Sequence, residues 1–116
     1  MSTVVYGIAN CDTIRKARRW LSDQGIEYQF HDVRKQGLEQ DKLQSWNSAL
    51  GWDTLLNRRG MMWRKLSDEQ KQNIDEASAL AIMLEEPAII KRPVLEHNGE
   101  LHIGFKEDSY REIFGL

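Results

Sequence analysis

The sequence predicts an α/β fold with a mixed four-stranded sheet and a helical insertion between its two halves. Three observations support this fold class. The first 33 residues change from a strand-like run to a helical pattern and back to a strand-like run. The middle of the chain, residues 39–85, is mainly helical in pattern. Residues 93–114 contain a hairpin signal followed by one more helical pattern.

The N-terminal segment predicts a strand–helix–strand unit. A strand is expected over residues 3–8, where apolar and β-branched side chains follow one another. A helix is expected over residues 12–24, ended by Gly25. Its apolar residues fall on one helix face: Ile14, Ala17, Trp20 and Leu21. Residues 26–33 alternate between apolar and polar side chains, which predicts a second strand. Because a helix connects the two strands within about 30 residues, we expect the strands to be parallel.

The middle of the chain predicts several helices. Residues 39–50 carry apolar side chains at helical spacing, and residues 53–57 predict a short helical turn. Residues 67–70 match the capping pattern that opens a further helix. Residues 76–85 are rich in strong helix formers, and Pro87 follows their end.

The C-terminal segment predicts a hairpin and a last helix. Asn98-Gly99 lies between the strand-like residues 93–97 and 101–103, which is a typical hairpin turn. Residues 107–114 predict a helix whose inward side chains are Tyr110, Ile113 and Phe114. This order of elements is that of a thioredoxin-like fold with a helical insertion, and we expect residues 1–116 to form one such domain.

Composition argues against several kinds of protein. The formal net charge of −2 provides no general basic field for direct binding of nucleic acid. No segment approaches the roughly 20 apolar residues that span a membrane. The three histidines are scattered, so no metal site is expected. A single cysteine cannot form an internal disulfide, and a reduced thiol suits a cytoplasmic location.

Cys11 is the first candidate for a catalytic residue. It lies between the first strand and the first helix, where the free N–H groups of the first helical turn stabilise a thiolate. The thiolate is the nucleophilic form of cysteine. Arg15 and Lys16 add positive charge about one turn further on, while Asp12 opposes them. The alternative is an inert, buried thiol, but the strand–helix junction favours a reactive one.

Arginines elsewhere could supply charge to such a thiol. Arg92 precedes Pro93 at a strand start, and a cis bond there would bring its guanidinium towards Cys11, where it could bind an oxyanion or carboxylate. Arg58 and Arg59 follow an apolar turn and could deliver cations to a pocket. For each arginine the alternative is a solvated surface side chain. The expected substrate-binding residues are Asn10, Arg15, Arg58, Arg59 and Arg92.

Together these segments resemble the ArsC family of glutaredoxin-coupled arsenate reductases, which includes the Spx regulators and a YffB branch. Residues 6–17 resemble its catalytic loop and first helix, and residues 55–60 resemble its central arginine segment. Residues 88–94 resemble its I-x-R-P-[IV] motif, the most specific match. The ending, residues 101–108, resembles that of Spx. The resemblance implies a thioredoxin-like fold, a nucleophilic Cys11, and a cis proline preceded by a functional arginine.

The chain departs from both functional patterns of this family. Arsenate reductases hold the oxyanion with three arginines. Here the central position falls on Asn57, which leaves Arg58 or Arg59 as substitutes, and Gly104 or Phe105 replaces the third arginine. Each lost charge-assisted contact costs roughly 1.5–3 kcal/mol of oxyanion binding, which predicts poor reduction of arsenate. Spx regulators usually sense oxidation with a Cys-x-x-Cys pair, but here the second position is Ile14. A disulfide switch at this motif is therefore impossible.

We therefore expect a thiol reductase of the arsenate reductase type that uses the single nucleophile Cys11. Its co-substrate would be glutathione, its partner glutathione or glutaredoxin, and its substrate a small oxyanion or a disulfide. The alternative is an Spx-like adaptor that binds RNA polymerase without redox catalysis. The reactivity of the Cys11 thiol distinguishes the two.

Overall fold

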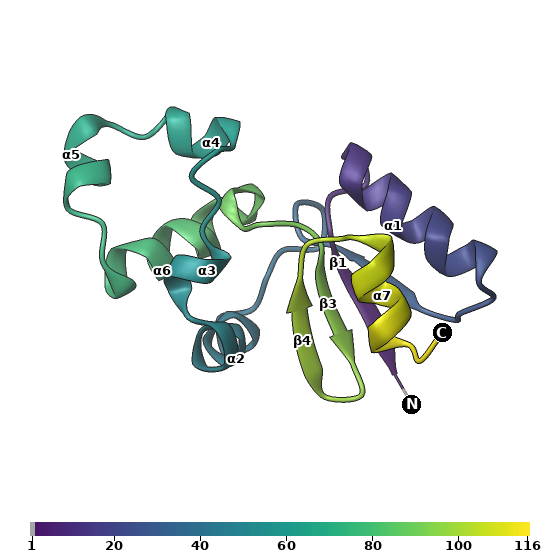
Figure 1. The fold of residues 1–116 in the computed structure, drawn as a ribbon. Helices are drawn as coiled ribbons and strands as arrows, with labels where there is room; N and C mark the ends of the chain where they lie inside the picture. The colour runs from purple at the N-terminus through teal and green to yellow at the C-terminus, as the bar shows by residue number, and fades with distance from the viewer. Residues whose placement is uncertain (1) are drawn as a thin grey trace. The chain divides into compact units, whose positions relative to one another are not determined.

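The computed structural model describes residues 2–116, which divide into two compact units. Unit 1 contains the described residues up to Asp32 together with Arg92–Leu116. Unit 2 contains Val33–Lys91, the helical insertion between the two halves of unit 1. Both are drawn in Figure 1.

Unit 1 is a mixed four-stranded sheet with two helices. Its elements are β1 (Thr3–Gly7), α1 (Asp12–Asp23), β2 (Gln29–Asp32), β3 (Val94–His97), β4 (Glu100–Ile103) and α7 (Glu107–Ile113). The strand order is β2-β1-β3-β4. β1 runs parallel to β2 and antiparallel to β3, and β3 pairs with β4 as the expected hairpin. The predicted thioredoxin-like fold is confirmed.

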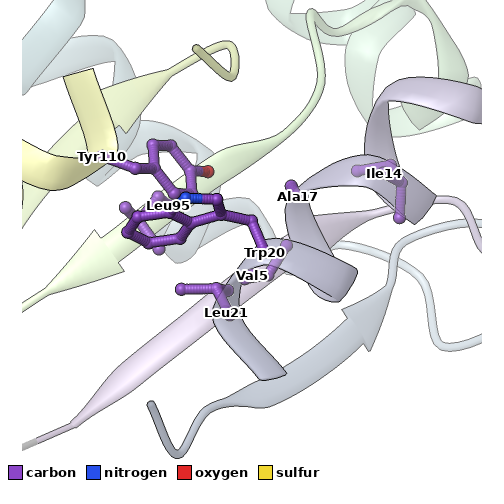
Figure 2. Packing of buried hydrophobic residues seen from close by; sticks show 7 residues of the cluster. All are labelled: Val5, Ile14, Ala17, Trp20, Leu21, Leu95 and Tyr110. Carbon is purple, nitrogen blue, oxygen red and sulfur yellow. The ribbon is translucent and has the colours of Figure 1, made fainter. Parts of the chain in front are cut away.

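The core of unit 1 lies between the sheet and its two helices (Figure 2). Val5 of β1 and Leu95 of β3 are paired across the strands and are fully buried. Trp20 of α1 meets Tyr110 of α7 edge to face, with ring centroids 5.8 Å apart. The predicted apolar face of the first helix is buried in this cluster, so burial of apolar surface holds α1 on the sheet.

β2 is shorter than the alternation of side chains predicts. It begins at Gln29 rather than Ile26, because the chain first completes the end of α1. The Gly25 N–H donates to the carbonyl of Ser22, and the Ile26 N–H donates to that of Leu21. Ile26 and the next two apolar residues of the alternation, Tyr28 and Phe30, still pack against the core. The predicted face is therefore right, although the ladder with β1 starts later.

Unit 2 consists of short helices. They are α2 (Gln40–Leu50), α3 (Trp52–Leu55), α4 (Met61–Arg64), α5 (Asp68–Gln72), α6 (Glu76–Glu85) and the 3₁₀ helix η1 (Pro87–Ile89). α2, α3 and α6 contact one another, and α4 contacts η1. The buried side chains include Leu43 and Trp46 of α2, Leu55 of α3 and Met83 of α6. This second core gives the insertion its own hydrophobic support.

Two details of unit 2 differ from the sequence prediction. The expected turn at residues 53–57 begins and ends earlier, because the chain is extended at Leu56 and bridges Ile90. The Asn57 N–H donates to the carbonyl of Ile89 over 2.9 Å, which takes Asn57 out of the helix. The four-residue helix α4 was not predicted. The predicted opening of α5 is confirmed, since the Ser67 and Gln70 side chains form a capping box.

Candidate functional site

Cys11 is the N-cap residue of α1, with an extended backbone at φ −145° and ψ 128°. Its carbonyl accepts the first helical hydrogen bond from the Arg15 N–H, at 2.9 Å. Its side chain makes no capping hydrogen bond, is half-buried and packs against the core cluster of unit 1. A thiol therefore stands where helices usually place a hydroxyl or carboxylate that accepts from the first-turn N–H groups.

The loop before Cys11 is tied to the sheet by a buried carboxylate. Asp32, the last residue of β2, is only 7% exposed. Its Oδ2 accepts a hydrogen bond from the Ala9 N–H, at 3.2 Å. Asp32 was not among the residues predicted from the sequence. In the sequence, the available hint was a carboxylate close to the end of a strand with alternating apolar residues. In the structure, Asp32 pairs in register with Gly7 of β1.

Gly7 fixes the other side of this loop. A Cβ on Gly7 would collide with the side chain of Ile14 in the first turn of α1. The absence of a side chain therefore lets the start of the helix approach the end of β1 closely. Gly7 and Asp32 together set where the loop leaves the sheet and where α1 begins.

Arg15 connects the residues on either side of Cys11. Its Nη1 donates to Oδ1 of Asp12, and its Nη2 donates to Oδ1 of Asn10. The structure thus joins the side chains of Asn10 and Arg15, two of the expected substrate-binding residues, on either side of Cys11 in the chain. The Arg15 and Asp12 side chains are 55% and 88% exposed. Their ion pair contributes at most about 1 kcal/mol to stability, and Asp12 offsets part of the positive charge beside the thiol.

The Arg92–Pro93 peptide bond is cis. Val94, the first residue of β3, pairs with Tyr6 in an antiparallel ladder. Because β3 begins opposite the end of β1, the backbone of Arg92 and Pro93 lies at the same end of the sheet as the start of the Cys11 loop. The carbonyl of Pro93 accepts from the Gly104 N–H at 2.9 Å, and Gly104 has a left-handed φ of 84° that favours glycine.

Arg58 and Arg59 lie in unit 2, on the rim of a hollow of about 520 Å³. Its lining residues are Asp53, Leu56, Asn57, Arg58, Arg59 and Lys91. Arg58 Nη2 donates to Oδ1 of Asp53 at 2.6 Å, and its guanidinium carbon lies 5.4 Å from the ring centroid of Trp63. The hollow therefore carries three cations, of which only Arg58 is paired with a carboxylate of its lining. The two arginines were expected from the sequence, whereas Asp53, Trp63 and Lys91 were not.

Other features of the described residues, 2–116, bear on which chemistry is available. No group of three or more His, Cys, Asp or Glu side chains in this range is placed to hold a metal ion. None of its helices has the length and apolar character required to cross a bilayer. Burial raises the pKa of Tyr110 in the core of unit 1.

Comparison with known proteins places these features in one family. A model of the ArsC family matches residues 6–113. An uncharacterised protein from Haemophilus influenzae is 43% identical over 110 residues, which cover 95% of this chain and 96% of that protein. The global transcriptional regulator Spx 2 from Oceanobacillus iheyensis is 29% identical, over 97% of this chain and 84% of the regulator.

Solved structures of similar proteins support the same family assignment. A protein named YffB is 46% identical, with a TM-score of 0.90 over 96% of this chain and 97% of that one. An arsenate reductase (ArsC) related protein from Brucella melitensis is 48% identical, with a TM-score of 0.81 over 100% and 97% of the two chains. These matches confirm the resemblance indicated by the Cys11 loop, the central arginine segment and the Arg92–Pro93 motif: the chain belongs to the ArsC family.

Proposed function

We propose that this protein is a glutathione-dependent thiol reductase in which Cys11 is the nucleophile. The observation that carries the proposal is the position of the Cys11 thiol at the N-cap of α1, half-buried and without a capping hydrogen bond. The first-turn N–H groups and the dipole of α1 attract negative charge at this end of the helix, which is where a sulfur nucleophile is expected. Reduced thiol chemistry of this kind suits the cytoplasm, where we place the protein.

The proposed reaction has two exchange steps. The Cys11 thiolate attacks the glutathione sulfur of a mixed disulfide, R–S–SG, forming Cys11–S–SG and releasing the thiolate R–S⁻. A second thiolate, from glutathione or from a glutaredoxin, then attacks the glutathione sulfur of this adduct and releases the Cys11 thiolate. The new S–S bond is that of glutathione disulfide or of a glutathionylated glutaredoxin, which carries the oxidising equivalents away. An external thiol is needed because the chain has no second cysteine.

The neighbouring polar residues are assigned supporting roles. Asn10 and Arg15 flank Cys11 in the chain and are hydrogen-bonded to each other, and we assign them, with Arg92, to binding anionic groups of the substrate. Arg58 and Arg59 are assigned to binding anionic groups on unit 2, because they line a hollow together with Lys91. No metal is required, since thiol–disulfide exchange transfers electrons between sulfur atoms alone.

The experiment is reduction of a glutathionylated peptide by reduced glutathione, with release of the peptide thiol as the readout. The unmutated chain should accelerate the release, and Cys11→Ser should return it to the uncatalysed rate. Adding a glutaredoxin distinguishes the two resolving thiols. Acceleration that survives Cys11→Ser would refute the proposed nucleophile. Arsenate, tested in parallel, should give little turnover, because Gly104 or Phe105 replaces the third arginine that holds the oxyanion in arsenate reductases.

A second candidate function rests on the relatives named Spx. The regulator from Oceanobacillus iheyensis aligns with 97% of this chain, and one from Streptococcus pyogenes is 27% identical over 88% of it. Under this proposal the protein would be an adaptor that binds RNA polymerase, and Cys11 would have no catalytic role. An inert Cys11 thiol together with stoichiometric binding of purified RNA polymerase would favour the adaptor.

A further inference from the structure

The charges of the chain are unevenly distributed. The whole chain has a formal net charge of −2, yet no acidic residue lies between Asp53 and Asp68. This stretch contains four cations: Arg58, Arg59, Arg64 and Lys65. A local excess of this kind on an acidic protein creates a positive field where a partner of opposite charge can bind.

Three of these cations have side chains without a polar partner in the described part of the chain. The Arg59, Arg64 and Lys65 side chains are exposed, and within residues 2–116 they form no hydrogen bond or ion pair. Arg58 differs, because it is held by Asp53 and by the ring of Trp63. The charges of the other three remain available to groups outside this chain.

An exposed apolar side chain lies among these cations. Met61, the first residue of α4, is 70% exposed, the most exposed large hydrophobic side chain in the described part of the chain. The Lys65 N–H donates to the carbonyl of Met61 at 3.2 Å, so the turn is helical from one to the other. Met61, Arg64 and Lys65 stand at positions i, i+3 and i+4 and therefore share one face of this turn.

The remaining side of α4 packs against the rest of unit 2, which leaves the face of Met61, Arg64 and Lys65 exposed. α4 contacts η1, and the half-buried Trp63 receives the guanidinium of Arg58. In unit 2, α4 and α5 lie apart from the packed helices α2 and α6 (Figure 1). An apolar centre bordered by cations has the anatomy of a protein-binding surface, in which methionine and arginine are enriched.

We propose that the face formed by Met61, Arg64 and Lys65 is a docking surface for an acidic protein segment that carries an apolar side chain. Carboxylates of the partner pair with the two cations, and its apolar side chain packs on Met61. Stacking of nucleic-acid bases is disfavoured, because the Trp63 ring is engaged by Arg58. A membrane surface is disfavoured because α4 has only four residues, whereas interfacial helices present a long apolar stripe.

The test uses the full chain and a labelled helical peptide with one central leucine flanked by aspartates and glutamates. A matched peptide has serine in place of the leucine. We expect binding of the first peptide that weakens with salt and is weakened about tenfold by Arg64→Glu with Lys65→Glu. Met61→Ser should weaken it about threefold or more. The control Arg19→Glu with Arg111→Glu makes the same change in net charge at exposed sites of unit 1 and should change binding less than about twofold.

Several outcomes would overturn the proposal. Equal binding of the two peptides would show that the apolar contact with Met61 does not contribute. An equal loss of binding in the control variant would show that only the net charge of the chain matters. Tighter binding to vesicles containing anionic lipid or to single-stranded RNA would assign the face to another ligand. Circular dichroism of each variant checks that it is folded. Cys11→Ser should bind the peptide like the unmutated chain, so failure here and failure of the proposed reductase are separate results.

Discussion

The two units of the molecule hold their candidate functional residues in different ways. In unit 1, the Cys11 loop is anchored to a buried carboxylate, and α1 is held by a core that contains Trp20 and Tyr110. In unit 2, Arg59, Arg64 and Lys65 project from a loop and a four-residue helix without polar partners in the described chain. Thiol–disulfide exchange requires that the attacking sulfur be held in a defined position and orientation relative to the disulfide. Electrostatic attraction of a charged partner acts over longer distances and works with mobile side chains.

The largest expected effects come from the two separate cores. Leu95→Ala in unit 1 should cost about 2–5 kcal/mol of unfolding free energy, and Trp46→Ala in unit 2 about 3–5 kcal/mol. Because the residues belong to different cores, amide hydrogen exchange should increase first within the unit that carries the change. A uniform increase over both units for both variants would show that the chain unfolds as one cooperative body.

The next prediction compares a buried carboxylate with an exposed one. Asp32→Ala should cost about 1–3 kcal/mol, because it leaves the Ala9 N–H without its acceptor. Asp53→Ala removes only an exposed ion pair with Arg58 and should cost less than about 1 kcal/mol. Urea unfolding measures both. Asp32→Ala should also slow the reaction of Cys11 with oxidised glutathione, and an unchanged rate would remove Asp32 from the support of the site.

A smaller effect is expected from the cation beside the thiol. Arg15→Ala should slow the reaction of Cys11 with oxidised glutathione about two- to fivefold at fixed pH, since exposed charges near a helix end contribute only a few tenths of a kcal/mol to about 1 kcal/mol. Arg92→Ala should slow this reaction as well. Pro93 restricts the backbone at Arg92, and a cation held in one position influences a thiol reaction more than a mobile cation does. Arg58→Ala and Arg59→Ala should mainly weaken binding of an anionic substrate. Equal slowing by all four variants would contradict the distinction between the units.

The smallest effect concerns the two capping boxes of unit 2. The backbone N–H and the side chain of Ser78 hold the pKa of Asp75 below its ordinary value of 3.8. A carboxylate with a lowered pKa stabilises α6 above that ordinary value, and this contribution is lost as the pH falls through the lowered pKa. Amide exchange of α6 should therefore increase in acid, and Asp75→Asn should remove this dependence. The uncharged box of Ser67 and Gln70 at α5 serves as the matched control.

The sequence predicts unit 1 better than unit 2, for physical reasons. Periodic apolar residues and the Asn98-Gly99 turn report regular elements directly, so the parallel pair β1 and β2, the C-terminal hairpin and the position of Cys11 at the start of α1 were predictable. The backbone bridge between Leu56 and Ile90 joins residues far apart in sequence, so no local pattern revealed where α3 ends. The contact of Asp32 with the Ala9 N–H is also non-local and depends on the register of β1 and β2.

The central claim is that the fold makes Cys11 a nucleophile. The most direct measurement is the rate at which Cys11 forms a mixed disulfide with oxidised glutathione, compared with the rate for an unstructured peptide of residues 6–17 at the same pH. Mass spectrometry identifies the adduct, and reduced glutathione should release it. We predict that the folded chain reacts faster than the peptide, because only the folded chain presents the aligned N–H groups of α1 to the thiol. A rate equal to or below that of the peptide would contradict the proposed function.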